Sequence, residues 1–94
     1  MSMLQEDRKV LSKMTQDMKR AIDSLEEELQ AIDWYRQRAD ASTDAALAKI
    51  FLHNMKEEEE HAAMLIGWIG GKDKTMGMNL KKYLGRQPAD LSKD

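Results

Sequence analysis

The sequence predicts an all-α protein, and three observations lead to that prediction. Apolar residues recur at spacings of three and four along most of the chain, which is the period of an amphipathic helix. The composition includes eight Met and only one Pro, and unbranched side chains such as Met lose little rotamer freedom in a helix. A chain of 94 residues is long enough for one small domain, so we expect a single helical domain over residues 1–94.

Charge and composition exclude several classes of function. A formal net charge of −2 gives no strong attraction to nucleic acid or to an anionic membrane, so we expect neither as a partner. No apolar run approaches the ~18 residues of a membrane span, and Met1–Val10 is too polar for a signal peptide. A cytoplasmic location is therefore the expectation. Because the chain has no Cys, any metal must be held by oxygen and nitrogen atoms.

The first expected helix spans about residues 4–39. Its apolar residues follow one another at helical spacing for some six turns: Leu11, Met14, Met18, Ile22, Leu25, Leu29 and Ile32. The short polar residues 40–44 should end it, because such side chains compete for backbone hydrogen bonds and cap helices. We expect Ser42 or Thr43 to cap the next helix.

The second expected helix spans about residues 44–69 and should end at Gly70-Gly71, since glycine readily adopts the left-handed conformation of a helix C-terminus. Two long helices joined by a short turn predict an antiparallel hairpin. A short third helix over about 73–84, interrupted by Gly77, and a polar tail over 87–94 complete the chain. Two helices cannot enclose a core, so we also expect the hairpin to self-associate.

A carboxylate within an apolar stripe is the main anomaly of the sequence. At about 100° per residue, Glu58 falls among the apolar residues of the second helix, and His61 follows one turn later. Buried carboxylates are usually paired, hydrogen-bonded or metal-bound. Glu57, Glu59 and Glu60 point elsewhere and are interpreted as a solvated face. A simple ion pair within the helix is the alternative interpretation of Glu58 and His61.

A second carboxylate, Glu28, lies at the edge of the apolar stripe of the first helix. It precedes Ser42 by fourteen residues and Glu58 follows Ser42 by sixteen, so a symmetric hairpin brings the two carboxylates level. One Glu plus Glu-x-x-His is half of the ligand set of the di-iron or di-manganese bundles of the ferritin-like type. One chain would then be half of a ferritin-like four-helix bundle. A second copy, related by a two-fold axis, would complete both the bundle and the ligand set. These ligands suit iron or manganese and also allow zinc.

The residues around these ligands resemble a known family, the encapsulated ferritins. The likeness covers roughly residues 21–83. It is densest in the run Glu26–Tyr35 (EEELQAIDWY), continues through Arg38–Asp44 (RADASTD) and resumes in His53-Asn54 and in Glu57–Met64 (EEEEHAAM).

The resemblance implies a function and a set of site residues. By analogy with the family, Glu28, Glu58 and His61 are the ferroxidase ligands, and Tyr35 is a catalytic residue that hydrogen-bonds behind them. The implied activity is oxidation of Fe(II) to Fe(III) by oxygen at a di-iron centre shared by two subunits, with Ca, Mn or Zn as substitutes. The implied partners are further copies, as dimers in a ring of ten chains, and an encapsulin shell protein. The location implied is the inside of that nanocompartment, although no shell-targeting segment is recognisable after Pro88.

Four further residues lie outside the expected ligand set. The resemblance implies that Glu27 and Trp34 attract metal on its way to the centre, whereas Gln30 departs from the family pattern, in which a Glu is usual. An exposed Trp34 is alternatively an anchor for another chain. His53 is interpreted as a surface imidazole and not as a ligand.

Two other classes of function remain open on the sequence alone. One is a helical oligomerisation or adaptor protein, in which Glu58 and His61 only fix the register of the helices. The other is a manganese or zinc site without turnover. Rapid aerobic oxidation of Fe(II) and the metal content of the purified protein distinguish these from a ferroxidase.

Overall fold

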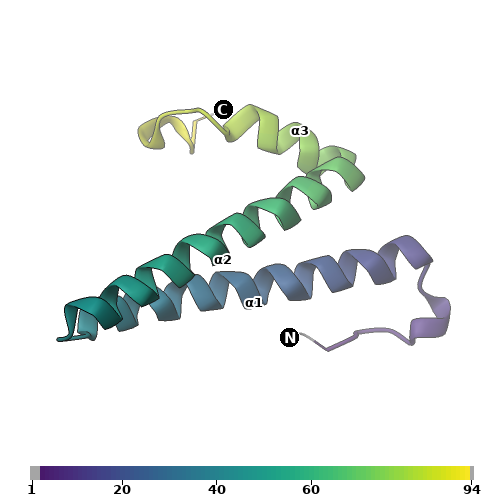
Figure 1. Ribbon diagram of the computed structural model, residues 1–94. Coiled ribbons are helices and arrows are strands. Elements are labelled where there is room, and N and C mark those ends of the chain that lie inside the picture. Colours follow the sequence, from purple (N-terminus) through teal and green to yellow (C-terminus); the bar gives the residue numbers. More distant parts are fainter. Residues whose placement is uncertain (1–2, 94) are drawn as a thin grey trace.

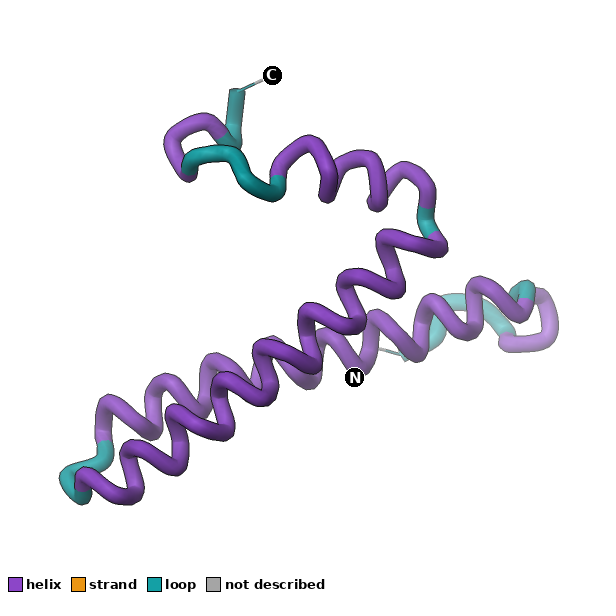
Figure 2. Tube along the Cα trace, turned by 45° about the horizontal axis from the view of Figure 1, so that its top comes forward, coloured by secondary structure: helices purple, strands orange, loops and turns teal. Residues whose placement is uncertain are grey.

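The computed structural model describes residues 3–93, and it confirms the all-α prediction. It contains α1 (Lys13–Ala41), α2 (Ala45–Lys72) and α3 (Lys74–Tyr83), with short 3-10 turns at Arg8–Val10 and Pro88–Asp90. Helices α1 and α2 form an antiparallel hairpin. They lie side by side near the turn between them and separate towards the other end, where α3 folds back from α2 (Figures 1 and 2). No helix among the described residues is both long and apolar enough to cross a membrane.

The start of α1 differs from the expectation. The helix begins at Lys13, because the Ser12 side chain accepts a hydrogen bond from the Thr15 backbone N–H at 3.1 Å and caps the helix there. The preceding segment, residues 3–12, is a non-α arm that reverses through the 3-10 turn. The Gln16 side-chain amide donates to the carbonyl oxygens of Arg8 and Leu11, at 3.4 and 3.1 Å, and so holds the arm against α1.

The turn between α1 and α2 uses different caps from those expected. Asp44 caps α2 by accepting a hydrogen bond from the Leu47 N–H at 2.8 Å. Ser42 instead ends α1, because both its backbone N–H and its hydroxyl donate to the carbonyl oxygen of Arg38. A carboxylate close to the positive N-terminal end of a helix is also favoured electrostatically. The hairpin geometry is therefore fixed by Ser42 and Asp44 together.

Gly70 and Gly71 do not end α2, contrary to the expectation. Both are helical, and the left-handed φ of 90° at Gly85 is the one positive value among the described residues. The helix ends at Lys72, and Asp73 caps it: its N–H donates to the carbonyl oxygen of Ile69, and its side chain caps α3. A Cβ on Gly70 would lie 2.8 Å from Leu80 Cδ1, and one on Gly77 would collide with the carbonyl oxygen of Gly70. These two glycines allow α3 to pack closely on α2.

Replacing Gly77 by alanine is expected to destabilise the α2–α3 corner. The added Cβ meets a backbone atom, so one helix must move, at an overpacking cost of about 1–3 kcal/mol. Gly67→Ala is the matched control. A Cβ at Gly67 meets nothing within 4 Å, and helix propensity alone should then stabilise by about 0.5–1 kcal/mol. Urea unfolding at one protein concentration measures both variants, and an equal effect of the two would contradict the close packing.

The hairpin has very little core. The buried hydrophobic residues among those described are Ala21, Met55, Ala62 and Ile69. The radius of gyration is 16.8 Å, whereas a globular domain of this length has about 12 Å. Many large apolar side chains of α1 and α2 are therefore exposed in the single chain, among them Leu29, Ile50, Met64 and Trp68.

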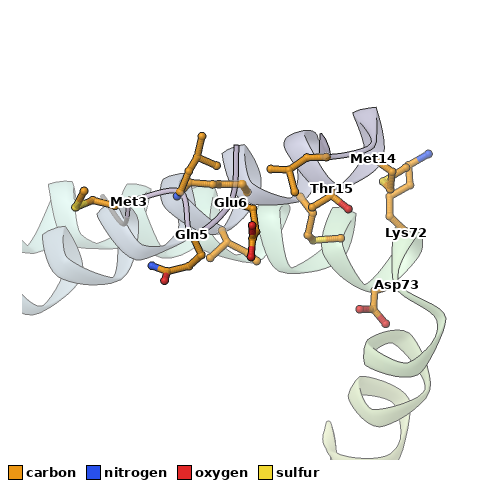
Figure 3. Close-up of a pocket in the computed structure, with 12 residues that line it drawn as sticks. Met3, Gln5, Glu6, Met14, Thr15, Lys72 and Asp73 are labelled. Carbon is orange, nitrogen blue, oxygen red and sulfur yellow. The ribbon is translucent and has the colours of Figure 1, made fainter. Parts of the chain in front are cut away.

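An apolar groove lies between the arm, the first turns of α1 and the junction of α2 with α3 (Figure 3). Figure 3 shows Met3, Gln5 and Glu6 on the arm side, with Lys72 and Asp73 at the junction. None of the sequence-predicted site residues lines this groove. Its place in the fold identifies it as the gap left where α1 and α2 separate.

Candidate metal centre

Three sequence-predicted ligands come together across the hairpin. Glu28 projects from the middle of α1, while Glu58 and His61 project from the middle of α2 one turn apart. His61 Nδ1 lies 3.4 Å from Glu58 Oε2 and 3.6 Å from Glu28 Oε2. One ligand atom from each residue lies within 4.8 Å of the others. The antiparallel pairing therefore brings the two carboxylates level, as the residue count from the turn predicted.

The burial of the three side chains gives the site a closed and an open side. The side chains of Glu28 and Glu58 are each 24% exposed, whereas that of His61 is 50% exposed. The two carboxylates thus lie at the contact of α1 with α2, and the imidazole lies at its edge. The site opens towards solvent on the side of α2 that carries His61.

One oxygen of Glu28 is left without a partner. Oε2 is shielded from solvent and accepts no hydrogen bond from any described residue. A buried acceptor without a donor costs about 1–3 kcal/mol, and more when it is charged. The His61 ring nearby does not satisfy it, since the 3.6 Å separation is beyond hydrogen-bond length. A cation between Glu28, Glu58 and His61 would remove this penalty.

The chemistry of the donor set narrows the choice of cation. Carboxylate oxygens with one imidazole suit first-row divalent metals such as iron, manganese and zinc. Three side chains leave several coordination positions unfilled on an iron or manganese ion. One chain therefore offers a partial site, and the alternative of an isolated ion pair between Glu58 and His61 does not account for the approach of Glu28.

Tyr35 lies two turns beyond Glu28 on α1. Its ring stacks on that of Phe51 from α2, with 6.1 Å between ring centroids. The Arg38 guanidinium lies 5.6 Å from the Tyr35 ring centroid and 5.7 Å from that of Trp34. Among the described residues, Tyr35 makes no hydrogen bond to any of the three ligands. The contact of Arg38 with these two rings was not predicted from the sequence. Its spacing of three residues from Tyr35 and four from Trp34 could have indicated it, because such residues are neighbours on a helix.

The other sequence-predicted residues stay outside the cluster. Glu27, Gln30 and Trp34 are exposed on α1, and the structure does not bring Glu27 into the group of ligand atoms. His53 Nε2 lies 3.0 Å from Glu57 Oε1, and both side chains are more than half exposed. This geometry agrees with the interpretation of His53 as a surface imidazole.

Comparison with known proteins identifies the family. The EncFtn-like family matches residues 3–87. The chain is 49% identical over 75 residues to the encapsulated ferritin-like protein of Rhodospirillum rubrum, covering 80% of this chain and 54% of the relative. It is 49% identical over 53 residues to the ferritin-like protein of Thermotoga maritima, covering 56% of this chain and 46% of that protein. It thus spans about half the length of these curated relatives.

A solved structure agrees with this result. A crystal structure of a Nitrosomonas europaea protein superposes with a TM-score of 0.87 at 46% identity, covering 92% of this chain and 94% of that one. The structural similarity therefore extends over nearly the whole chain, including both long helices. The chain belongs to the EncFtn-like family of encapsulated ferritin-like proteins.

Proposed function

We propose that two copies of this chain form a di-iron centre that oxidises Fe(II) to Fe(III). The observation that carries the proposal is the unpartnered Oε2 of Glu28, which faces Glu58 and His61 within a few ångströms. A two-fold axis near the open side of the site would bring in a second Glu28, Glu58 and His61. Four carboxylates and two imidazoles then form the ligand set of a di-iron bundle.

Each ligand has a role in this arrangement. The two Glu58 carboxylates would hold both iron ions, and the Glu28 and His61 of each chain would together hold one of them. Ligands shared in this way would keep the two metals close to one another, as in other two-metal sites. Oxygen is the proposed oxidant, and iron is the substrate that leaves as Fe(III). The protein contributes ligand positions and a contact surface that keeps bulk water out.

We assign supporting roles to the residues around the ligands. The stacking of Tyr35 on Phe51 and its contact with Arg38 hold its ring near the contact of the two helices. From there its hydroxyl orients a ligand carboxylate once the second copy is bound. Glu27 and Trp34, on the exposed flank of α1, attract incoming metal, as the resemblance implies.

The exposed apolar residues support assembly beyond a dimer. At about 100° per residue, Ile50, Met64 and Trp68 share the side of α2 with His61. Ile22 and Leu29 of α1 face the opposite side of the hairpin, and all five are exposed. Unpartnered apolar surfaces of this kind mark interfaces. Two such sides allow each chain to bind two others, which supports a ring; the number of ten chains rests on the family resemblance.

An encapsulin shell is the proposed surrounding of this ring. The support is the name of the Rhodospirillum rubrum relative, which is described as encapsulated. Iron is the proposed native metal because that relative and the Thermotoga maritima relative are described as ferritin-like. Calcium, manganese and zinc are proposed only as substitutes at the same oxygen and nitrogen ligands.

Aerobic addition of Fe(II) tests the proposal against the adaptor alternative. A ferroxidase gives fast, saturable growth of near-ultraviolet absorbance. An adaptor, or a manganese or zinc site without turnover, gives only the background rate of Fe(II) autoxidation. Stopped-flow absorbance with a protein-free blank distinguishes these results, and a wild-type rate equal to the blank would exclude the ferroxidase.

The proposed entry site for metal on α1, formed by Glu27 and Trp34 with Gln30 beside them, gives a further prediction. Gln30 offers a neutral amide where a carboxylate is usual in the family, and a neutral oxygen is a weaker ligand for a divalent cation. Gln30→Glu should therefore increase the metal bound per chain without changing the central ligands. Gln37→Glu, which adds the same charge two turns away on α1, is the control. Equal metal content of the Gln30 variant and the wild type would contradict the assignment.

A further inference from the structure

Two methionines have nearly equal exposure but lie in very different places. Met64 of α2 is 66% exposed, and Met78 of α3 is 64% exposed. Met64 follows His61 by one helical turn, whereas Met78 lies beyond the α2–α3 corner. In the isolated chain, where their exposure is nearly equal, a difference in their oxidation therefore reports on position and not on exposure.

Met64 lies beside the open side of the candidate metal centre. Residues three apart on a helix have Cβ atoms about 5–6 Å apart, so the Met64 side chain neighbours the half-exposed His61 ring. Met55 also lies three residues from a proposed ligand, Glu58, but it is only 7% exposed and belongs to the buried core. Met64 is thus the accessible thioether next to the ligands.

We propose that Met64 is the methionine that hydrogen peroxide from the iron centre oxidises first, giving methionine sulfoxide. This inference rests on the proposed ferroxidase function. Two Fe(II) ions pass two electrons to one oxygen molecule, which takes up two protons and becomes hydrogen peroxide. The Met64 sulfur then attacks one peroxide oxygen, a sulfur–oxygen bond forms and the oxygen–oxygen bond breaks. The second oxygen leaves as water, with the sulfur oxidised by two electrons and the peroxide reduced by two.

Position decides which thioether reacts. Oxidation of Met follows its access to the oxidant, and peroxide dissolved in the bulk solution reaches side chains of equal exposure equally. Peroxide released at Glu28, Glu58 and His61 meets Met64 before it diffuses to Met78. If a second copy covers Met64 in the assembly, bulk peroxide reaches that sulfur more slowly while locally formed peroxide still does so.

Peptide mass spectrometry of the assembled protein tests the inference. The protein is given Fe(II) in air, or an equal amount of hydrogen peroxide without iron, and the sulfoxide contents of the Met64 and Met78 peptides are compared at early times. We expect the Met64-to-Met78 ratio to be at least about fivefold higher with Fe(II) than with bulk peroxide. Catalase should suppress oxidation of Met78 more than that of Met64. Glu58→Ala should remove the preference.

The outcomes separate this inference from the proposed function. Fast iron oxidation with the same Met64-to-Met78 ratio in both treatments would overturn the assignment of Met64 and leave the ferroxidase intact. Iron oxidation no faster than the protein-free blank would overturn both. If Glu58→Ala still oxidised Met64 in preference to Met78, the assignment of Met64 would also be wrong, because the peroxide would then not come from the proposed iron centre.

Discussion

Alanine at Glu28, Glu58 or His61 is expected to abolish rapid oxidation of Fe(II). In a two-fold site, each substitution removes two ligands at once. Loss of groups that only support a metal ligand typically costs about 10–100-fold in affinity or activity, so loss of the ligands themselves should lower the initial rate by more than about 100-fold. Stopped-flow absorbance after aerobic mixing with Fe(II) measures the rate.

Glu60→Ala provides the matched control for the three ligand variants. Glu60 lies on α2, the helix of Glu58 and His61, is exposed and makes no ion pair among the described residues. Its removal takes away a carboxylate, as Glu28→Ala and Glu58→Ala do, without touching the cluster, so the rate should stay near that of the wild type. A ligand variant that retained the wild-type initial rate would remove that residue from the ligand set.

Divalent metal is expected to drive assembly of the chain. Each chain supplies half of the proposed site, and four carboxylates within a few ångströms repel one another when no cation lies between them. A ligand that binds only the assembled state stabilises it in proportion to the logarithm of its concentration over its dissociation constant, or about 2.7 kcal/mol at 100 times that constant. Metal-free protein at low concentration should therefore form smaller species, and Fe(II) should shift it towards the ring. Size-exclusion chromatography with light scattering measures the shift.

Glu58→Ala sharpens the assembly prediction. The variant loses the proposed bridging carboxylates, so repulsion at the interface falls and the response to metal weakens. Glu60→Ala keeps those carboxylates and should respond as the wild type does. A size distribution that is indifferent to metal at every concentration would count against the interfacial site.

The hairpin and the approach of Glu28 to Glu58 and His61 could be predicted from the sequence. Spacings of three and four determine which faces of α1 and α2 are apolar, and the contact of those faces determines the pairing. With the turn near Ser42, counting residues brings Glu28 level with Glu58 and His61, and the structure places their ligand atoms within 4.8 Å of one another. Helix periodicity is a property of the chain alone, which is why this part was predictable.

The helix ends were harder to predict, because they depend on particular hydrogen bonds and contacts. The apolar period runs through Ser12, but the hydrogen bond from Thr15 to that side chain starts α1 there. Glycine is a residue type that often ends helices, yet Gly70 lies within α2 and leaves room for α3 to pack against it. The unpartnered oxygen of Glu28 likewise depends on which atoms surround it. Such features follow from tertiary packing and not from sequence period.

Native mass spectrometry during an anaerobic titration with Fe(II) tests the shared centre most directly. Because each proposed site needs Glu28, Glu58 and His61 from two chains, iron should be retained by dimers and larger even-numbered species, with two ions per pair of chains. The monomer should retain none at the same free concentration, and Glu58→Ala should lose the paired stoichiometry. Monomers that hold iron as tightly as dimers do would contradict a centre formed between two subunits.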